Sequence, residues 1–391
     1  MGFRSAAVLT GILCLASCGV PDPGAFYDTP ALANAAPGTL ISVAPFSPPL
    51  PGAASYRVLY NSTDIHGNII PVSGVVYVPL APPPPGGRNV VAWAHPTTGT
   101  APGCAPSLDT NVIGGITTAG SIPGLAAFIL AGDIVAATDY QGMGVPGVHP
   151  YLVGSSEGRD ILDSVRAARA LPGADLSGKF VVWGHSQGGQ AALFAGQMAA
   201  SYAPDLKLVG VAAAAPPTDM RGEFGEPFSG DAGRLLGAYL YHSWSITYGI
   251  PVTTVVYPSA VPAMLNAASK CINTLGEGIA AVHAAAALDP VFLSQKPDQT
   301  PPWSSYFDEN SPGQVPAGAP LLILQGTRDP TVEPHWTRSF VAKVCAQHET
   351  VDFVQMKGVK HLLIAYKTAP LVNAWFQARF AGAPAPNGCK G

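Results

Sequence analysis

The chain has 391 residues, of which 48% are hydrophobic and only 11% are charged. Its formal net charge of −4 leaves no basic field of the kind that attracts nucleic acid. The composition therefore predicts a globular protein of one or two domains with a large apolar core, and it excludes nucleic acid as a partner.

The first 17 residues are typical of an export signal. Arg4 supplies a positive charge, residues 6–16 form a short apolar run, and Leu-Ala-Ser-Cys at 15–18 is similar to a bacterial lipobox. We expect cleavage before Cys18, lipid attached to its thiol, and a tether over residues 18–25. Ordinary cleavage near the same point, giving a freely secreted protein, is the alternative. No later apolar run is long enough to span a membrane.

Four cysteines lie beyond the export segment: Cys104, Cys271, Cys345 and Cys389. An even number of cysteines in an exported chain predicts two disulfides, and the spacing leaves three pairings open. None of them shows the Cys-x-x-Cys spacing of a zinc site, so we expect no structural metal.

The rest of the chain alternates strands and helices around one interruption. Residues 26–52 are rich in Pro, Ala and Gly and predict an irregular wrap. We expect strands at 56–60, 69–78, 89–94, 134–138, 180–183, 208–214, 321–325 and 351–355. We expect core helices at 122–130, 155–171, 190–200, 334–346 and 368–380.

Residues 216–319 break this alternation with helical patches at 234–241, 261–272 and 275–288, and with many aromatic side chains. The pattern predicts an α/β protein with one open, mostly parallel sheet and helices on both faces. Its core consists of residues 26–215 and 320–391, and a helical cap over 216–319 is inserted between two strands. Glu157 and Asp160 lie near the start of one core helix, where acidic groups favour the helix dipole. We give them that structural role.

The sequence Gly-His-Ser-Gln-Gly at 184–188 lies between a predicted strand and a predicted helix. A serine on such a sharp turn stands above the sheet as a nucleophile, and Gly184 and Gly188 allow the close approach of backbones. The alternative is a glycine-rich turn that happens to contain a serine. The flanking elements favour Ser186 as the nucleophile.

A serine nucleophile needs a histidine base that is oriented by a carboxylate. Asp329 follows the strand at 321–325, and His361 follows the last strand, so both lie where this fold places its acid and base. An exposed turn aspartate is the alternative for Asp329. His335 and His348 compete for the base, but neither lies in the loop beyond the last strand.

Two N–H donors must face the developing oxyanion. One is expected from Gln187, directly after the nucleophile. The other must come from the loop after the strand at 89–94, where Pro96 has no amide hydrogen to give. Thr97 and Thr98 are the candidates; we prefer Thr98, whose hydroxyl would add a third bond.

The remaining histidines have weaker assignments. His185, beside the nucleophile, is expected to pack in the core. His95 is expected to brace the oxyanion loop. His149, His242 and His283 have no supporting partners in the sequence.

Several motifs together carry a resemblance to a known family. They lie at 95–99 with 104–107, 139–142, 154–163, 184–189, 308–310, 322–329 and 358–361. The chain resembles the secretory lipases, which are α/β-hydrolases, from about Phe26 to Cys389. The resemblance implies a Ser186–Asp329–His361 triad, a lid-bearing cap over an acyl tunnel, and activity on carboxylic esters that include triacylglycerols.

The same resemblance implies the disulfides Cys104–Cys271 and Cys345–Cys389. The family varies at the position of Thr98, where some members carry an acidic side chain. The lipobox is not a general feature of the family, so anchoring at Cys18 depends on this sequence alone.

The sequence thus predicts a serine esterase or triacylglycerol lipase for medium or long acyl chains, because an apolar cap favours the burial of methylenes. It needs no cofactor and no metal. Its partners are an acyl ester and, if Cys18 is lipidated, a membrane surface of the cell envelope; the oligomeric state stays open. The alternatives are an acyltransferase, an esterase for a polymer, lactone or peptide, and a non-catalytic surface lipoprotein.

Overall fold

The computed structural model describes residues 24–29, 35–108, 121–225 and 230–389. The predicted signal peptide, its cleavage point, Cys18 and all but the last two residues of the tether lie outside these ranges. Within them, no helix is long and apolar enough to cross a membrane.

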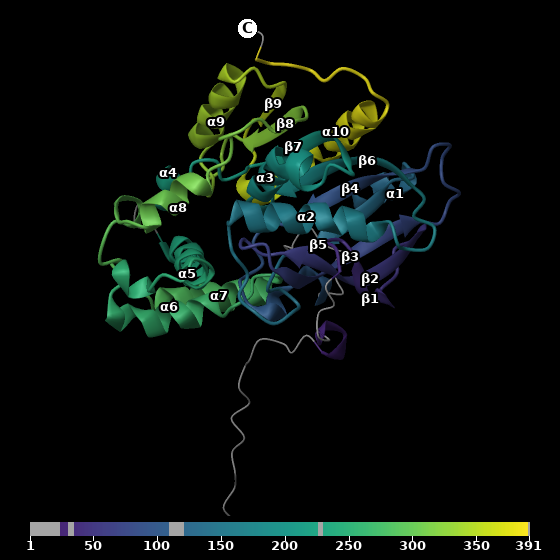
Figure 1. Ribbon diagram of the computed structural model, residues 1–391. Helices are drawn as coiled ribbons and strands as arrows, with labels where there is room; N and C mark the ends of the chain where they lie inside the picture. The colour runs from purple at the N-terminus through teal and green to yellow at the C-terminus, as the bar shows by residue number, and fades with distance from the viewer. Residues whose placement is uncertain (1–23, 30–34, 109–120, 226–229, 390–391) are drawn as a thin grey trace, which may run out of the picture.

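A central sheet organises the molecule (Figure 1). Over the described residues it has nine strands, in the spatial order β1 (Leu40–Pro45), β2 (Ala53–Thr63), β3 (Ile69–Pro79), β5 (Ile134–Thr138), β4 (Arg88–Ala94), β6 (Leu176–His185), β7 (Lys207–Ala214), β8 (Leu321–Gly326) and β9 (Val351–Met356). The pairs from β1 through β3 to β5 are antiparallel, and all pairs from β5 through β4 to β9 are parallel. A parallel sheet is covered on both faces, so its strands form continuous apolar runs that the sequence displays clearly.

The irregular wrap predicted for residues 26–52 is wrong in part. Residues Leu40–Pro45 form β1, which pairs with β2 at the edge of the sheet. None of the residues of β1 is fully buried. The strand is therefore held by its backbone pairing with β2, and it leaves no alternating apolar pattern in the sequence.

Two apolar cores flank the sheet. The helices α2 (Gly154–Ala168), α3 (Gln187–Tyr202) and α9 (Pro334–Ala346) share one core, to which Ile161, Leu193 and Phe340 contribute. The helices α1 (Leu125–Leu130) and α10 (Ile364–Phe380) share the core on the other face, with Phe128 close to Phe376. The sheet thus has helices on both faces, as the sequence predicts.

A third apolar core is formed mostly by the segment of the chain that connects β7 to β8. Five α-helices of the described residues occur there: α4 (Met220–Phe224), α5 (Gly230–Thr247), α6 (Val261–Ala268), α7 (Leu275–Ala286) and α8 (Trp303–Glu309). They stand to one side of the sheet (Figure 1). Their buried aromatic residues include Tyr239, Trp244 and Trp303. This helical layer has its own apolar interior.

One cap helix is shorter than predicted. The helix expected over residues 261–272 ends at Ala268. The backbone N–H of Ile272 instead donates to the carbonyl oxygen of Thr98 at 2.8 Å, and Cys271 forms a disulfide with Cys104. These tertiary links end the helix, and a local sequence pattern does not contain them. The second disulfide joins Cys345 to Cys389, so both pairings are those that the resemblance implies.

Candidate active site

Ser186 occupies the turn between β6 and α3 in a strained conformation, with φ 57° and ψ −125°. A Cβ on Gly184 would lie 1.9 Å from the carbonyl oxygen of Gly188, and a Cβ on Gly188 would lie 2.0 Å from that of Ala94. Real Cβ atoms do not approach so closely, so both positions require glycine. A left-handed serine costs on the order of 1–3 kcal/mol and persists only where its surroundings enforce it.

The structure brings Ser186, His361 and Asp329 together. His361 Nε2 lies 2.8 Å from Ser186 Oγ, and its Nδ1 lies 2.8 Å from Asp329 Oδ2. The three residues follow β6, β9 and β8, whose carboxyl ends meet at one edge of the parallel sheet. His335 instead lies beside Glu333 on the exposed start of α9, and His348 lies in the turn after that helix. The structure therefore pairs the serine with His361.

Asp329 is fixed on both carboxylate oxygens. Its Oδ1 accepts the backbone N–H groups of Thr331 at 2.9 Å and Val332 at 3.0 Å, while Oδ2 also accepts from Gln325 Nε2 at 3.2 Å. Burial acts to raise the pKa of Asp329, but the hydrogen bond and charge of His361 and the two backbone donors outweigh it. The net pKa lies below its usual value, so this carboxylate stays ionised at neutral pH.

His185 supports the backbone of His361. Its Nε2 lies 3.0 Å from the His361 carbonyl oxygen, and the two ring centroids are 5.0 Å apart. Burial, with a smaller contribution from the charge of His361, lowers the pKa of His185 to about 3. The ring is therefore neutral and packs in the core, as the sequence predicts.

Thr97 and Thr98 lie in the loop after β4. Thr97 Oγ1 is 3.0 Å from the hydroxyl of Tyr151. Thr98 is fully buried, and its Oγ1 has no hydrogen-bond partner among the described residues. His95 lies at the base of this loop, with its ring nitrogens 2.7 Å from the Pro96 carbonyl oxygen and 3.2 Å from that of Asp139.

Glu157 lies in the first turn of α2, as the sequence predicts, and Asp160 follows one turn later. Both side chains are fully buried, and their carboxyl groups have further hydrogen-bond partners. The Glu157 carboxylate accepts from the backbone of Leu152 at 2.9 Å and from Gln187 Nε2 at 2.8 Å, and Asp160 accepts from the backbone of Gln141 at 2.8 Å. Their burial could have been predicted from helical spacing. Glu157 lies four residues before Ile161, which the sequence places on the apolar face of the same helix.

His149 also has partners that the sequence did not reveal. It is fully buried, with Nε2 2.7 Å from Gln187 Nε2 and Nδ1 3.1 Å from the Gln141 carbonyl oxygen. Burial lowers its pKa to about 3, so the ring is neutral. Gln187 lies 38 positions further along the chain, and no local pattern links the two residues.

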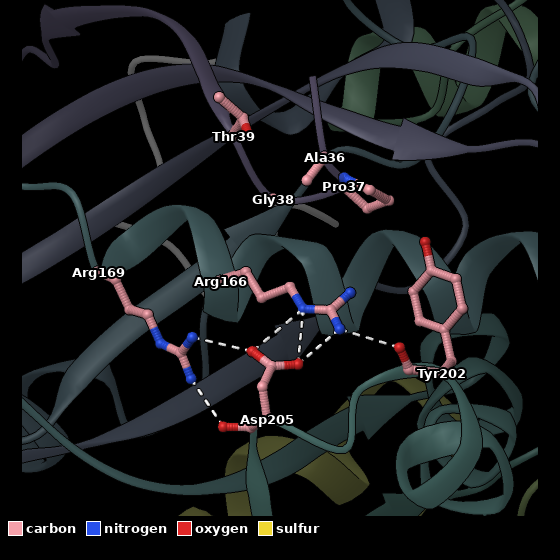
Figure 2. Close-up of a pocket in the computed structure, with 8 residues that line it drawn as sticks. All are labelled: Ala36, Pro37, Gly38, Thr39, Arg166, Arg169, Tyr202 and Asp205. Atoms are coloured by element: carbon pink, nitrogen blue, oxygen red, sulfur yellow. Dashed lines mark hydrogen bonds and ion pairs between the residues drawn. The ribbon is translucent and has the colours of Figure 1, made fainter. Parts of the chain in front are cut away.

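A surface hollow of about 480 Å³ lies away from the triad (Figure 2). Arg166 and Arg169 reach into it, but both pair with Asp205, at 2.6 Å and 2.9 Å. Their charges are thus engaged within the protein, and such exposed pairs contribute little to stability. The hollow joins the end of α2 to the loop after α3 and has no triad residue in its lining.

In the part of the chain that the structure describes, no group of three His, Cys, Asp or Glu residues is arranged to hold a metal ion.

Known proteins resemble this chain in sequence. A family model described as "Secretory lipase" matches residues 110–241. "Lipase A" of Arthroderma benhamiae is 25% identical, with 95% of this chain and 82% of that protein covered. The chain thus resembles the secretory lipases in sequence. A "probable inactive lipase" of Mycobacterium tuberculosis is 23% identical, with 93% of this chain and 83% of that protein covered.

Solved structures share the fold. Candida antarctica lipase A in its closed state has a TM-score of 0.75 at 20% identity, covering 95% of this chain and 90% of that one. The rice cell wall degrading esterase LipA from Xanthomonas oryzae has a TM-score of 0.63 at 20% identity, covering 86% of this chain and 96% of that one. The resemblance to secretory lipases and the α/β-hydrolase fold are confirmed. This resemblance supports a hydrolase of lipid esters and, with the two disulfides, an exported protein.

Proposed function

We propose that the protein is a serine carboxylic-ester hydrolase for medium- or long-chain acyl esters, triacylglycerols included. The observation that carries the proposal is the continuous hydrogen-bonded row from Ser186 Oγ through His361 to Asp329, with both contacts at 2.8 Å. This arrangement is suited to activate a serine hydroxyl, which is a poor nucleophile by itself.

In this mechanism His361 Nε2 takes the proton from Ser186 as the hydroxyl oxygen attacks the ester carbonyl carbon. The ester C–O bond then breaks, and the leaving alkoxide receives that proton from His361. Water then attacks the acyl-enzyme and gives a proton to His361. The bond between the acyl carbon and Ser186 Oγ breaks, His361 returns the proton to Ser186 Oγ, and the carboxylic acid is released. Asp329 holds His361 Nδ1–H and stabilises the imidazolium that forms in each step.

The oxyanion would be bound by the backbone amides of Gln187 and Thr98, with Thr97 as the alternative to Thr98. Gln187 is the first residue of α3, where the amide has no acceptor within the helix. The buried hydroxyl of Thr98 has no hydrogen-bond partner among the described residues, so it is free to serve as a third donor. Such donors act strongly because they are already oriented before charge develops.

The substrate class is supported by the apolar interior of the helical layer over residues 216–319, which we propose is a cap for an acyl chain. Leu362 and Leu363 directly follow His361 and are exposed by 73% and 39%. An acyl or alkyl group near the base would cover them. The relatives named as lipases support the same class.

The direct test combines one substitution with one probe. Ser186→Ala is expected to lower kcat about 10⁶-fold, because the attacking oxygen is lost. A fluorophosphonate should label wild-type protein and leave Ser186→Ala unlabelled. Absence of labelling in folded wild-type protein would contradict catalysis and favour a surface module, an outcome to which the inactive label of the mycobacterial relative gives weight.

Substrate class needs a second assay. Hydrolysis of p-nitrophenyl esters from acetate to palmitate, with and without added alcohols, measures chain-length preference and acyl transfer. We expect hydrolysis to peak at about eight or more carbons, as about 0.8 kcal/mol is gained for each buried CH₂. A peak at acetate would favour an esterase for another ester class, and a dominant transfer product would favour an acyltransferase.

We also propose removal of residues 1–17 and lipidation of Cys18, which would anchor the protein to the cell envelope. The intact mass of protein extracted from membranes tests this proposal. A diacylglyceryl adduct is expected. A mature chain without lipid in the medium would show the freely secreted alternative.

A further inference from the structure

Two glutamine side chains hold the first turn of α3 against the loop formed by residues 149–152. Gln187 Nε2 lies 2.7 Å from His149 Nε2 and 2.8 Å from Glu157 Oε1. One turn later, Gln190 Nε2 donates to the Leu152 carbonyl oxygen at 3.2 Å. The helix start that follows Ser186 is thus tied to loop 149–152 by side chains as well as by packing.

The hydrogen-bond roles within this cluster follow from chemistry. His149 Nδ1 faces the Gln141 carbonyl oxygen, which only accepts, so Nδ1 carries the proton of the neutral ring. His149 Nε2 is therefore an acceptor. The side-chain NH₂ of Gln187 then donates one hydrogen to His149 and the other to Glu157. Both donors of Gln187 are used inside the protein, so its side chain acts as a brace.

Glu157 is the centre of the brace. Its Oε1 accepts from Gln187 Nε2 and from the Leu152 backbone, and Leu152 is held in a left-handed conformation with φ 57°. Loop 149–152 also contacts the segment of Thr97 and Thr98, which contains the other candidate oxyanion donors. The hydroxyl of Tyr151 lies 3.0 Å from Thr97 Oγ1. One buried carboxyl thus orients both segments that carry the candidate oxyanion donors.

We propose that Glu157 is a positioning residue of the oxyanion hole. Its carboxyl fixes the Gln187 side chain and loop 149–152, and through them the direction of the Gln187 backbone amide. The inference rests on the proposed function, in which that amide binds the oxyanion. A misdirected amide binds the oxyanion of the transition state less tightly. Substitution of Glu157 should therefore lower kcat more than it changes KM.

The test compares Glu157→Leu, Glu157→Gln and a matched control, with p-nitrophenyl butyrate as a soluble substrate. Active sites are first counted with a fluorophosphonate, so that kcat refers to folded protein only. Glu157→Leu is expected to lower kcat about 10- to 100-fold with KM within about twofold. Glu157→Gln should recover most of kcat, because its amide oxygen accepts the same two hydrogen bonds.

The control is Asp163→Asn, a buried acid on the same helix that contacts Ser62, Tyr202 and Arg166. Its kcat per active site should stay at the wild-type value. An alkyl boronic acid gives a second readout, since its tetrahedral adduct places an oxygen in the oxyanion hole. Its inhibition constant should rise in Glu157→Leu by about the same factor as kcat falls, which a loss of stability alone would not produce.

A wild-type kcat and boronate affinity in Glu157→Leu would overturn the inference. So would equal impairment of Glu157→Gln and Glu157→Leu. If Glu157→Leu yields no titratable sites, Gln187→Met replaces it, and unchanged kcat in that variant is equally contradictory. Folded wild-type protein without esterase activity would instead contradict the proposed function, so the two failures are distinguishable.

Discussion

The two halves of the site are built in different ways. The proposed triad half takes its residues from turns directly after β6, β8 and β9 of one rigid sheet. The proposed oxyanion half depends on the loop after β4, the first turn of α3, loop 149–152 and α5, a helix of the proposed cap. Ser243 of α5 donates to the His149 carbonyl oxygen and accepts from the Tyr151 backbone, both at 2.7 Å. Trp244 Nε1 donates to the Tyr151 carbonyl oxygen at 2.9 Å.

This difference predicts different responses to substitution. No other side chain can take over the role of a triad residue, so its substitution should abolish nearly all activity. The geometry of the oxyanion half depends on many contacts, so removing one contact should lower activity only in part. The difference also shows that the helical layer supports the site through hydrogen bonds and not only by covering it.

After Ser186→Ala, the largest effect should come from Asp329→Asn. The amide cannot accept the His361 Nδ1–H as a carboxylate does, so the wrong imidazole tautomer is favoured and kcat should fall about 10⁴-fold. Steady-state kinetics measure it, and a circular dichroism spectrum like that of the wild type shows that folding is retained. A loss below tenfold would show that Asp329 does not orient the base.

Thr98→Val tests the other half with a substitution of nearly equal shape. Loss of an oxyanion donor costs about 10² in kcat, and we expect up to that loss here. Thr98→Ser keeps the hydroxyl and should retain most activity. Equal kcat in Thr98→Val and wild type would show that the hydroxyl takes no part.

A smaller effect is expected from Ser243→Ala in the cap helix. It removes both hydrogen bonds to loop 149–152, and kcat should fall by roughly 2- to 10-fold. Stability should fall by about 1–3 kcal/mol, the cost of buried groups left unpaired. Ser245→Ala is the control, because the hydroxyl of Ser245, on the same helix, donates to the Ile250 carbonyl oxygen and to no other group among the described residues. Ser245→Ala should lose stability without losing kcat. Equal losses of kcat in Ser243→Ala and Ser245→Ala would show that the hydrogen bonds of Ser243 have no specific link to the oxyanion half.

Glu157→Gln should change activity least among these substitutions. It should, however, clearly change how stability depends on pH. Burial raises the pKa of Glu157 to about 8, although hydrogen bonds from Gln187 and Leu152 oppose the rise. Between the ordinary pKa near 4.5 and the raised value near 8, the folded protein binds more protons at this site than the unfolded chain. Its contribution to the free energy of unfolding therefore falls as pH rises through that window.

Glu157→Gln lacks this contribution, so its stability relative to wild type should increase from about pH 5 to about pH 8 and then level off. Urea unfolding at each pH measures the difference. His149, Tyr140, Tyr151 and Asp160 face Glu157 and are present in both proteins, so their effects largely cancel. A difference that is independent of pH would show that Glu157 is already ionised at the acidic end of this range.

The sequence predicted the fold, and it predicted that Ser186, Asp329 and His361 follow three strands of one sheet, because both predictions depend on local signals. Buried parallel strands are apolar throughout, and the acid and base follow strands that the chain order identifies. The supports of the oxyanion half are tertiary. His149 and Gln187 meet only when α3 packs beside loop 149–152, and the helix-start position of Glu157 does not reveal its contacts with Gln187 and Leu152. The edge strand β1 was missed because backbone pairing alone defines it.

The disulfide between Cys104 and Cys271 has a consequence for synthesis. The two cysteines are 167 positions apart, so the first waits unpaired until most of the chain has been made. Asp329 and His361 come later still, on the last two strand ends. Under the proposed function, the growing polypeptide cannot hydrolyse an ester until its final segment joins the sheet. We expect the membranes of the producing cell to be spared while the chain passes through them.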